Sequence, residues 1–209
     1  MRTDRLPGLT YVVTDLETTG PVPGEHAMLS FASVACREQV GDCGSFSRNV
    51  TPLPGSAMDA PTATFWRDNE AMYQRTQIDQ RDPAEAMEEY VRWVRSLPGD
   101  RVFVAQPLAF DGRWMDWYLH RFTDYRLFMG PWEGESLMLG GGIDLPSYAM
   151  GVLGWDYRRC RRQDYPQAWL GATSHTHDAL DDATQHAHIL MSLQRVRAAQ
   201  PAQQSLPRA

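Results

Sequence analysis

The sequence predicts an α/β fold in which a central mixed β-sheet is flanked by α-helices. Stretches of strand type come first along the chain, and strands then alternate with helical periodicity, an order typical of α/β domains. The chain has 209 residues, enough for one sizeable core, and no internal repeat or linker divides it. A hydrophobic content of 43% and a charged content of 22% are typical of a globular domain. We therefore expect one domain over residues 8–197 and a flexible tail over residues 198–209.

Several stretches have the composition of β-strands. The first three form an antiparallel meander, and a turn at Gly41 joins the second to the third. The expected strands are Tyr11–Asp15, Met28–Cys36, Asp42–Val50, Arg101–Ala105 and Arg126–Met129. A sheet that begins with a meander and gains later strands through helices is expected to be mixed.

The remaining periodic stretches predict helices. The second of them has the clearest start, because Asp82 can cap it, Pro83 suits its first position and apolar residues follow at helical spacing. The expected helices are Thr64–Arg75, Pro83–Leu97, Asp111–Phe122, Pro146–Leu153 and Asp178–Arg195.

Charge and cysteine content restrict the classes of function. A net charge of −6 argues against extended contact with duplex DNA, which requires many Lys and Arg side chains, but it allows a grip on a few nucleotides at a strand end. Cys36, Cys43 and Cys160 lack metal-ligand spacing, and their odd number argues against a disulfide framework. Cys36 is expected in the core. Because we find no signal-peptide pattern and no apolar run of bilayer length, we expect a cytoplasmic protein without a membrane partner.

The stretch from Tyr11 to Gly20 carries the strongest chemical signal. A buried strand ends in Asp15 and Glu17, and a Thr-Thr-Gly turn follows. Because side chains alternate along a strand, both carboxylates point to the same face. Like charges side by side repel unless something neutralises them, and a divalent cation, which prefers oxygen ligands, is one candidate. The alternative is a solvated strand end that leads into a loop.

Asp111 is the second candidate acidic residue. It follows the fourth expected strand through a short loop and is expected to begin a helix. An aspartate there can simply cap the helix or interact with its dipole.

The third candidate stretch runs from His177 to Asp182. His177 precedes the last expected helix, and a histidine in that position is often structural or solvent-exposed. Asp178 and Asp181 are expected to be a helix cap and a surface residue. The other histidines, which lack zinc-site spacing, are His26, His120, His175, His186 and His188.

Taken in chain order, these stretches resemble the three motifs of the DEDD exonucleases. The segment from Asp15 to Gly20 resembles the first motif, and Asp111, preceded by Phe110, resembles the second. His177-Asp-Ala-Leu-Asp-Asp182 resembles the third motif in its histidine subtype, DEDDh. The family includes the proofreading subunit of bacterial DNA polymerase, ribonuclease T, oligoribonuclease and exoribonuclease-like branches.

The resemblance covers Tyr11 to about Leu193 and implies a ribonuclease H-like fold. One departure concerns the loop before the second motif. Many members have an asparagine four residues before the aspartate, where this chain has Pro107. The shape of that loop and its substrate contacts are therefore not carried over.

The resemblance implies a 3′–5′ exonuclease that hydrolyses phosphodiester bonds at single-stranded RNA or DNA ends and releases nucleoside 5′-monophosphates. Asp15, Glu17, Asp111 and Asp182 would hold two Mg²⁺ or Mn²⁺ ions, which serve the attacking and leaving oxygens when they lie about 3.5–4 Å apart. His177 would be the general base, since an ordinary histidine pKa of about 6.5 suits proton transfer at neutral pH.

Leu16, Thr18, Trp66 and Phe110 are the expected substrate contacts. In related enzymes, the positions of Leu16 and Thr18 touch the terminal nucleotide. Trp66 can stack on a base or pack in the core, whereas core packing is favoured for its neighbour Phe65. The basic run of residues 158–162 can meet backbone phosphate or form a solvated loop.

Two other functions stay open from the sequence. One is a nuclease of the same fold that acts only on very short oligonucleotides. The other is a non-catalytic nucleic-acid-binding or protein-binding module, although all five motif residues are present. The expected partner is a single-stranded 3′ end, and a homodimer with an exposed aromatic residue such as Trp132 is also considered. The choice between RNA and DNA depends on contacts with the 2′-hydroxyl, which no motif identifies.

Overall fold

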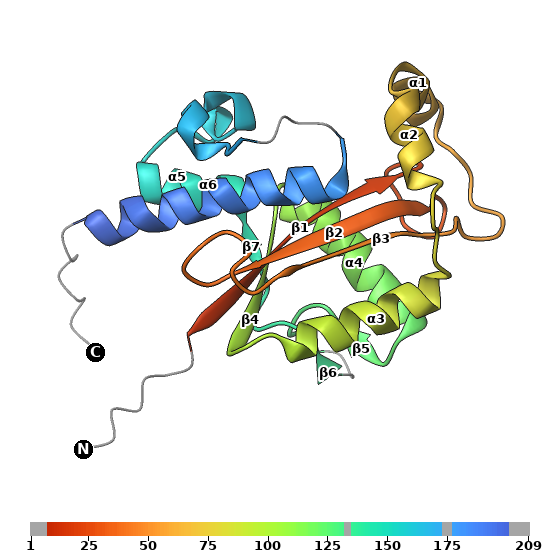
Figure 1. Ribbon diagram of the computed structural model, residues 1–209, viewed down its shortest axis with the longest axis horizontal. Helices are drawn as coiled ribbons and strands as arrows, with labels where there is room; N and C mark the ends of the chain where they lie inside the picture. The colour runs from red at the N-terminus through yellow and green to blue at the C-terminus, as the bar shows by residue number, and fades with distance from the viewer. Residues whose placement is uncertain (1–7, 132–134, 173–176, 201–209) are drawn as a thin grey trace.

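The computed structural model describes residues 8–131, 135–172 and 177–200. Its main sheet has five strands in the order β3-β2-β1-β4-β7, with helices on both faces (Figure 1). The strands are β1 (Leu9–Thr18), β2 (Met28–Cys36), β3 (Ser45–Asn49), β4 (Asp100–Ala105) and β7 (Ile143–Asp144). β1 pairs antiparallel with β2 and parallel with β4, so the expected mixed sheet is confirmed.

Two hydrophobic layers cover the sheet. On one face α3 (Pro83–Ser96) and α4 (Leu108–Phe122) pack over a core that contains Phe31, Tyr90 and Trp114. On the other face α5 (Leu145–Leu153) and α6 (Ala179–Ala199) pack over Val13, Val34 and Leu190. Figure 1 shows α6 lying across β1 and β2, which brings its first turn over the sheet.

A pair of short helices stands where β1 ends (Figure 1). They are α1 (Ala60–Asp68) and α2 (Glu70–Thr76), where the sequence predicts one helix. Asn69 divides them with a non-helical backbone, and its side chain donates to the Phe65 carbonyl. Asparagine side chains compete in this way with the hydrogen bonds of a continuing helix.

The expected element boundaries need three corrections near the candidate site. β1 continues to Thr18 because β2 pairs with it as far as Met28, so the first two carboxylates lie inside the strand. α4 begins at Leu108, one turn before the predicted start, so Asp111 is not its cap. β3 begins only at Ser45.

Other elements differ farther from that end of the sheet. The expected strand over residues 126–129 is wrong: β5 (Tyr125–Arg126) pairs with β6 (Glu135–Ser136), outside the main sheet. Three 3₁₀ turns that the sequence pattern did not reveal follow α5. They are η1 (Tyr157–Arg159), η2 (Arg162–Asp164) and η3 (Gln167–Trp169). Cys36 is buried in the core, as expected.

At the C-terminal end, α6 continues to Ala199, and residues 201–209 lie outside the described part of the chain. The predicted tail and domain limits therefore stay predictions. Trp132 and His175 also lie outside the described residues. No helix in the described part of the chain combines the length and apolar character needed to cross a membrane.

We predict that Tyr118→Phe destabilises the domain by about 2 kcal/mol, because the Tyr118 hydroxyl accepts the buried Met28 N–H at 2.8 Å and its loss leaves that donor unpaired. The melting temperature should fall by roughly 4–8 °C in calorimetry. Tyr157→Phe is the matched control, since Tyr157 is 50% exposed. Equal melting temperatures for the two variants would contradict the assigned role of this hydrogen bond.

Candidate active site

Four carboxylates from three elements meet at the end of β1. Asp15 and Glu17 alternate along β1 and therefore share a face of the sheet. The first turn of α6 brings Asp182 to these two carboxylates, and its negative charge acts on both. Asp111 comes from the first turn of α4, which follows β4; because β1 and β4 are parallel, both strands end at the same edge. The four side chains of the predicted metal set are thus gathered in one place.

Burial and mutual repulsion raise the pKa values of these acids. Burial, followed by the charges of Asp111 and Glu17, raises the pKa of Asp15 well above its usual range. Burial, followed by the charges of Asp182 and Asp111, does the same to the pKa of Glu17. Carboxylates arranged in this way stay ionised at neutral pH only if a nearby cation offsets their charge.

Asp111 gives the clearest indication that this site suits a cation. Its side chain is 3% exposed, and burial raises its pKa to about 8, even though its carboxylate accepts the backbone N–H of Leu16. Its Oδ2 atom is buried without a hydrogen-bond partner among the described residues. Buried polar atoms are almost always satisfied, so an all-oxygen donor set with such an atom fits a hard divalent ion.

His177 lies next to the carboxylates, directly before α6. One ring nitrogen of His177 and one carboxylate oxygen each from Glu17 and Asp182 lie within 4.8 Å of one another. The ring also contacts Phe65 edge to face, with 4.9 Å between centroids. The His177 backbone has a φ of 54°, in the left-handed region, and such outliers in non-glycine residues concentrate at functional sites.

The Asp178 side chain holds the start of α6 in place. Its carboxylate accepts the backbone N–H groups of Leu180 and Asp181, which makes it the helix cap that the sequence predicts. This cap fixes where α6 begins. It thereby sets the positions of His177 before the helix and Asp182 in its first turn.

A cavity of about 360 Å³ opens beside the carboxylates. All four predicted substrate contacts line it, together with Glu17 and other residues of α1. Its walls are Leu16, Glu17, Thr18, Pro61, Thr62, Phe65, Trp66 and Phe110. It is apolar on several sides and has a carboxylate at one end, which suits a nucleoside whose phosphate faces the acidic residues.

Within this cavity, the two aromatic residues of α1 differ in burial and in the groups they contact. Trp66 is 3% exposed, and its indole N–H donates to the Thr18 carbonyl at 2.9 Å. Phe65 is more exposed and contacts His177. Trp66 therefore fastens α1 to β1, while Phe65 is the ring that faces the site.

His186 is a further site residue that sequence reasoning set aside. Its Nδ1 atom lies 3.7 Å from Asp15 Oδ1, and its side chain is 8% exposed. The missed signal was its spacing: His186 follows Asp182 by four residues, which places both on one face of α6.

Comparisons with known proteins agree with this geometry. No family model matches the chain. A curated Escherichia coli protein, "3′–5′ DNA exonuclease Cap18", is 25% identical over 199 residues, which is 94% of this chain and 96% of that protein. E. coli exonuclease I bound to single-stranded DNA superposes with a TM-score of 0.64 and 17% identity, over 93% of this chain. The nuclease domain of 3′hExo, a DEDDh family member bound to rAMP, gives 0.60 and 10% identity, over 92% of this chain and 94% of its own.

The near full-length match to a named exonuclease accompanies a shared fold and motif residues that are gathered in one place. The chain is similar to a 3′–5′ DNA exonuclease and has the fold of a DEDDh exonuclease domain. It spans 42% of the exonuclease I chain, so only part of that enzyme has a counterpart here. The ribonuclease H-like fold expected from the sequence is confirmed.

The basic run of this exonuclease makes mostly local contacts. The Arg158 guanidinium pairs with Asp156 at 2.8 Å, and Arg162 donates to Gln185 on α6. Arg159 lies over the Trp155 ring at 5.2 Å. A contact of this run with phosphate stays a prediction.

We predict that the metal-free exonuclease loses stability as pH rises. The folded protein retains protons on acids such as Asp111, with a pKa of about 8, whereas the unfolded chain loses them near pH 4. Because the native state binds more protons in this window, the free energy of unfolding falls from about pH 5 to pH 8. One retained proton corresponds to about 1.4 kcal/mol per pH unit, or roughly 3–6 °C in melting temperature.

Calorimetry in EDTA tests this prediction by comparing the melting temperatures of the wild type and the Asp111→Asn variant. The variant should melt above the wild type at pH 8 and close to it at pH 5. Mg²⁺ should stabilise the wild type more at pH 8, because the ion binds ionised carboxylates. The same pH profile for both proteins would contradict the account.

Proposed function

We propose that this exonuclease removes nucleotides one at a time from the 3′ end of single-stranded DNA, with two divalent ions in its site. The observation that carries the proposal is the convergence of Asp15, Glu17, Asp111 and Asp182 beside His177. Each product is a nucleoside 5′-monophosphate. The shortened strand keeps a free 3′-hydroxyl and becomes the next substrate.

The four carboxylates would hold Mg²⁺ or Mn²⁺, since their donors are all oxygens. The buried Oδ2 of Asp111 and the raised pKa values of Asp15 and Glu17 support this assignment. Bound ions supply charge neutralisation at phosphorus and lower the pKa of water. The protein contributes a rigid arrangement, because β1, α4 and α6 each present their ligands from regular structure.

His177 would act as the general base. It takes a proton from the attacking water, whose oxygen bonds to phosphorus as the bond from phosphorus to the 3′-oxygen breaks. His177 stands near enough to Glu17 and Asp182 for a phosphate held there to face its ring. Phe65 packs against that ring edge to face and restricts its orientation.

The terminal nucleoside would occupy the cavity of Leu16, Thr18, Phe65 and Phe110. Its aromatic and aliphatic walls stack on any base, which suits an enzyme that removes successive nucleotides without regard to sequence. Glu17 lines the same cavity, which supports an orientation with the nucleoside's phosphate toward the carboxylates.

The choice of DNA rests on the similar proteins. The curated relative is named a DNA exonuclease, and exonuclease I is bound to single-stranded DNA in one matching structure and to a dT13 oligonucleotide in another. RNA is the competing substrate, since the 3′hExo domain is bound to rAMP. The non-catalytic alternative has less support, because four neighbouring acids that repel one another, two of them buried, serve no purpose in a binding module without metal.

A time course on 5′-labelled single-stranded DNA and RNA of matched sequence tests the proposal. We predict a ladder that shortens from the 3′ end in Mg²⁺ or Mn²⁺, is absent in EDTA and is faster on DNA. His177→Ala should lower kcat by about 10²–10⁴-fold, the typical contribution of a general base, with KM little changed.

His120→Ala is the matched control, because His120 is exposed on α4. It should keep wild-type rates. Near-normal turnover by His177→Ala would remove His177 from the mechanism, and faster cleavage of RNA would overturn the choice of DNA.

A further inference from the structure

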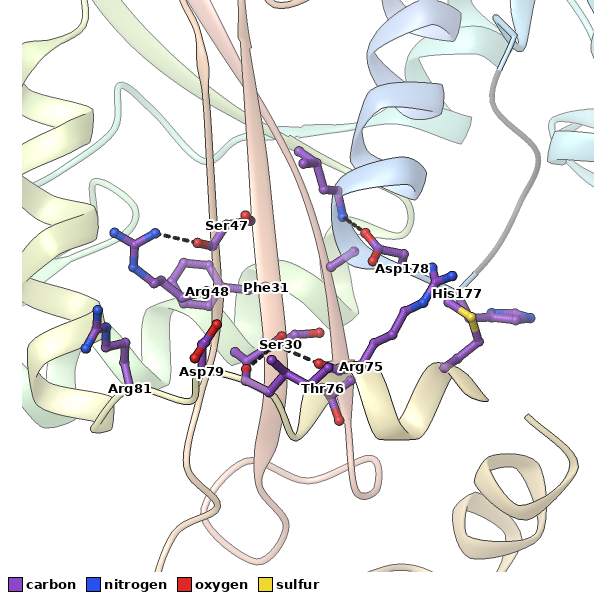
Figure 2. A pocket seen from close by; sticks show the side chains of 15 residues that line it. Ser30, Phe31, Ser47, Arg48, Arg75, Thr76, Asp79, Arg81, His177 and Asp178 are labelled. Atoms are coloured by element: carbon purple, nitrogen blue, oxygen red, sulfur yellow. Dashed lines mark hydrogen bonds between the residues drawn. The ribbon is translucent and has the colours of Figure 1, made fainter. Parts of the chain in front are cut away.

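A second, larger hollow adjoins the site on the α6 face of the sheet. Its volume is about 510 Å³, and it lies between β2, β3, the start of α6 and the segment after α2 (Figure 2). Most of its polar lining comes from residues outside every motif of the sequence. They include Ser30, Asn49, Arg75, Asp79 and Arg81.

The floor of the hollow is continuous with the carboxylate site. Glu17 on β1 pairs with Ser30 on β2, and Ser30 pairs with Asn49 on β3. Paired residues on neighbouring strands share a face, and each strand adds about 4.8 Å. A row of polar residues therefore leads from Glu17 on β1 across the sheet to the hollow. Its far end, at Asn49 on β3, lies two strand spacings, about 10 Å, from Glu17.

His177 is shared by the two hollows. It lines the larger one together with Asp178, and its ring contacts Phe65, which lines the terminal-nucleoside cavity. A strand whose last nucleoside fills the smaller cavity would pass His177 at the scissile phosphate. Its preceding nucleotides would then enter the larger hollow.

Two arginine side chains on the walls of the hollow are not paired directly with an acidic side chain among the described residues. Arg48 is paired with Glu89 at 2.6 Å. Arg75 and Arg81 are exposed, and neither forms an ion pair within the described part of the chain. In Figure 2 the Arg75 side chain extends toward His177 and Asp178 at the start of α6.

Two acidic residues of the hollow, Asp79 and Asp178, offset the formal charge of these arginines, but neither forms an ion pair with them among the described residues. Asp178 uses its carboxylate to cap α6. Asp79 lies on the segment between α2 and α3 with a φ of 49° and forms no ion pair among the described residues. The apolar surface of Ile78, 59% exposed, adjoins the arginines and suits contact with a sugar or base.

We propose that this hollow is a backbone-binding channel for the nucleotides that precede the scissile phosphate. Arg75 and Arg81 bind their phosphates, and the row of Ser30 and Asn49 forms the floor. The inference rests on the proposed exonuclease function and deepens it. It assigns the enzyme to strands several nucleotides long and argues against a nuclease restricted to dinucleotides, because a dinucleotide has no phosphate that reaches this channel.

The test measures cleavage by the wild type and by the double variant Arg75→Gln/Arg81→Gln. Each protein is assayed on thymidine oligonucleotides of two and of twelve residues. On the twelve-residue strand, KM should rise about tenfold or more with kcat unchanged. The slope of log KM against log salt should decrease by about 0.7 for each phosphate that the variant no longer binds. On the dinucleotide, kcat/KM should stay within about twofold of the wild type.

A matched control removes the same charge elsewhere: Arg92→Gln/Arg121→Gln alters two exposed arginines on α3 and α4, beyond the opposite face of the sheet. An equal rise in KM for the control would mean that net charge alone acts. If the Arg75 and Arg81 variant lost as much kcat/KM on the dinucleotide as on the twelve-residue strand, the two arginines would instead act at the scissile phosphate. Either result, or an unchanged KM and salt slope, would overturn the channel.

Fluorescence anisotropy, which measures binding of a labelled twelve-residue strand in EDTA, distinguishes failure of the exonuclease proposal from failure of the channel proposal. If the wild type cleaves nothing, the exonuclease proposal fails, and weaker binding by the Arg75 and Arg81 variant still supports the channel. If the wild type cleaves and both variants bind and cleave as it does, the channel fails and the exonuclease proposal stands.

Discussion

Repulsion among buried carboxylates at the end of β1 is the constraint on which the rest of this structure depends. Burial and the neighbouring charges disfavour ionisation of Asp15 and Glu17, and a buried oxygen of Asp111 has no partner among the described residues. The packing around them must therefore hold the acids together against a cost in free energy. That cost is offset when a divalent cation binds, which turns an unfavourable arrangement into a metal site.

The strand pairing and a small number of side-chain hydrogen bonds bring the carboxylates together. Parallel pairing of β1 with β4 brings the start of α4 to the end of β1, and α6 crosses the same edge from the opposite layer. The Asp178 cap sets the first turn of α6, and the Trp66 indole fastens α1 against Thr18. The same sheet face that carries Glu17 continues through Ser30 to the arginine-lined hollow, so the carboxylate site and the hollow lie on a single surface of the sheet.

Much of this site follows from the sequence because its signals are local. Alternation along β1 predicts that Asp15 and Glu17 share a face, and the cap at Asp178 predicts where α6 begins. Contacts between distant segments could not be predicted in this way. The α4 start depends on how the chain leaves β4, and the indole of Trp66 is buried against β1. Arg75 lines the same hollow as the start of α6 only because the fold brings these distant segments to it. Division of the expected helix at Asn69 likewise depends on a side-chain hydrogen bond.

Anomalous diffraction from crystals soaked in Mn²⁺ tests the central claim most directly, because it locates the ions without relying on turnover. We expect two peaks bounded by Asp15, Glu17, Asp111 and Asp182, one of them within coordination distance of the buried Asp111 Oδ2. Asp111→Asn crystals should lose at least that peak. Absence of both peaks from a crystal whose four carboxylates are ordered would contradict the account, as would ions bound only elsewhere on the protein.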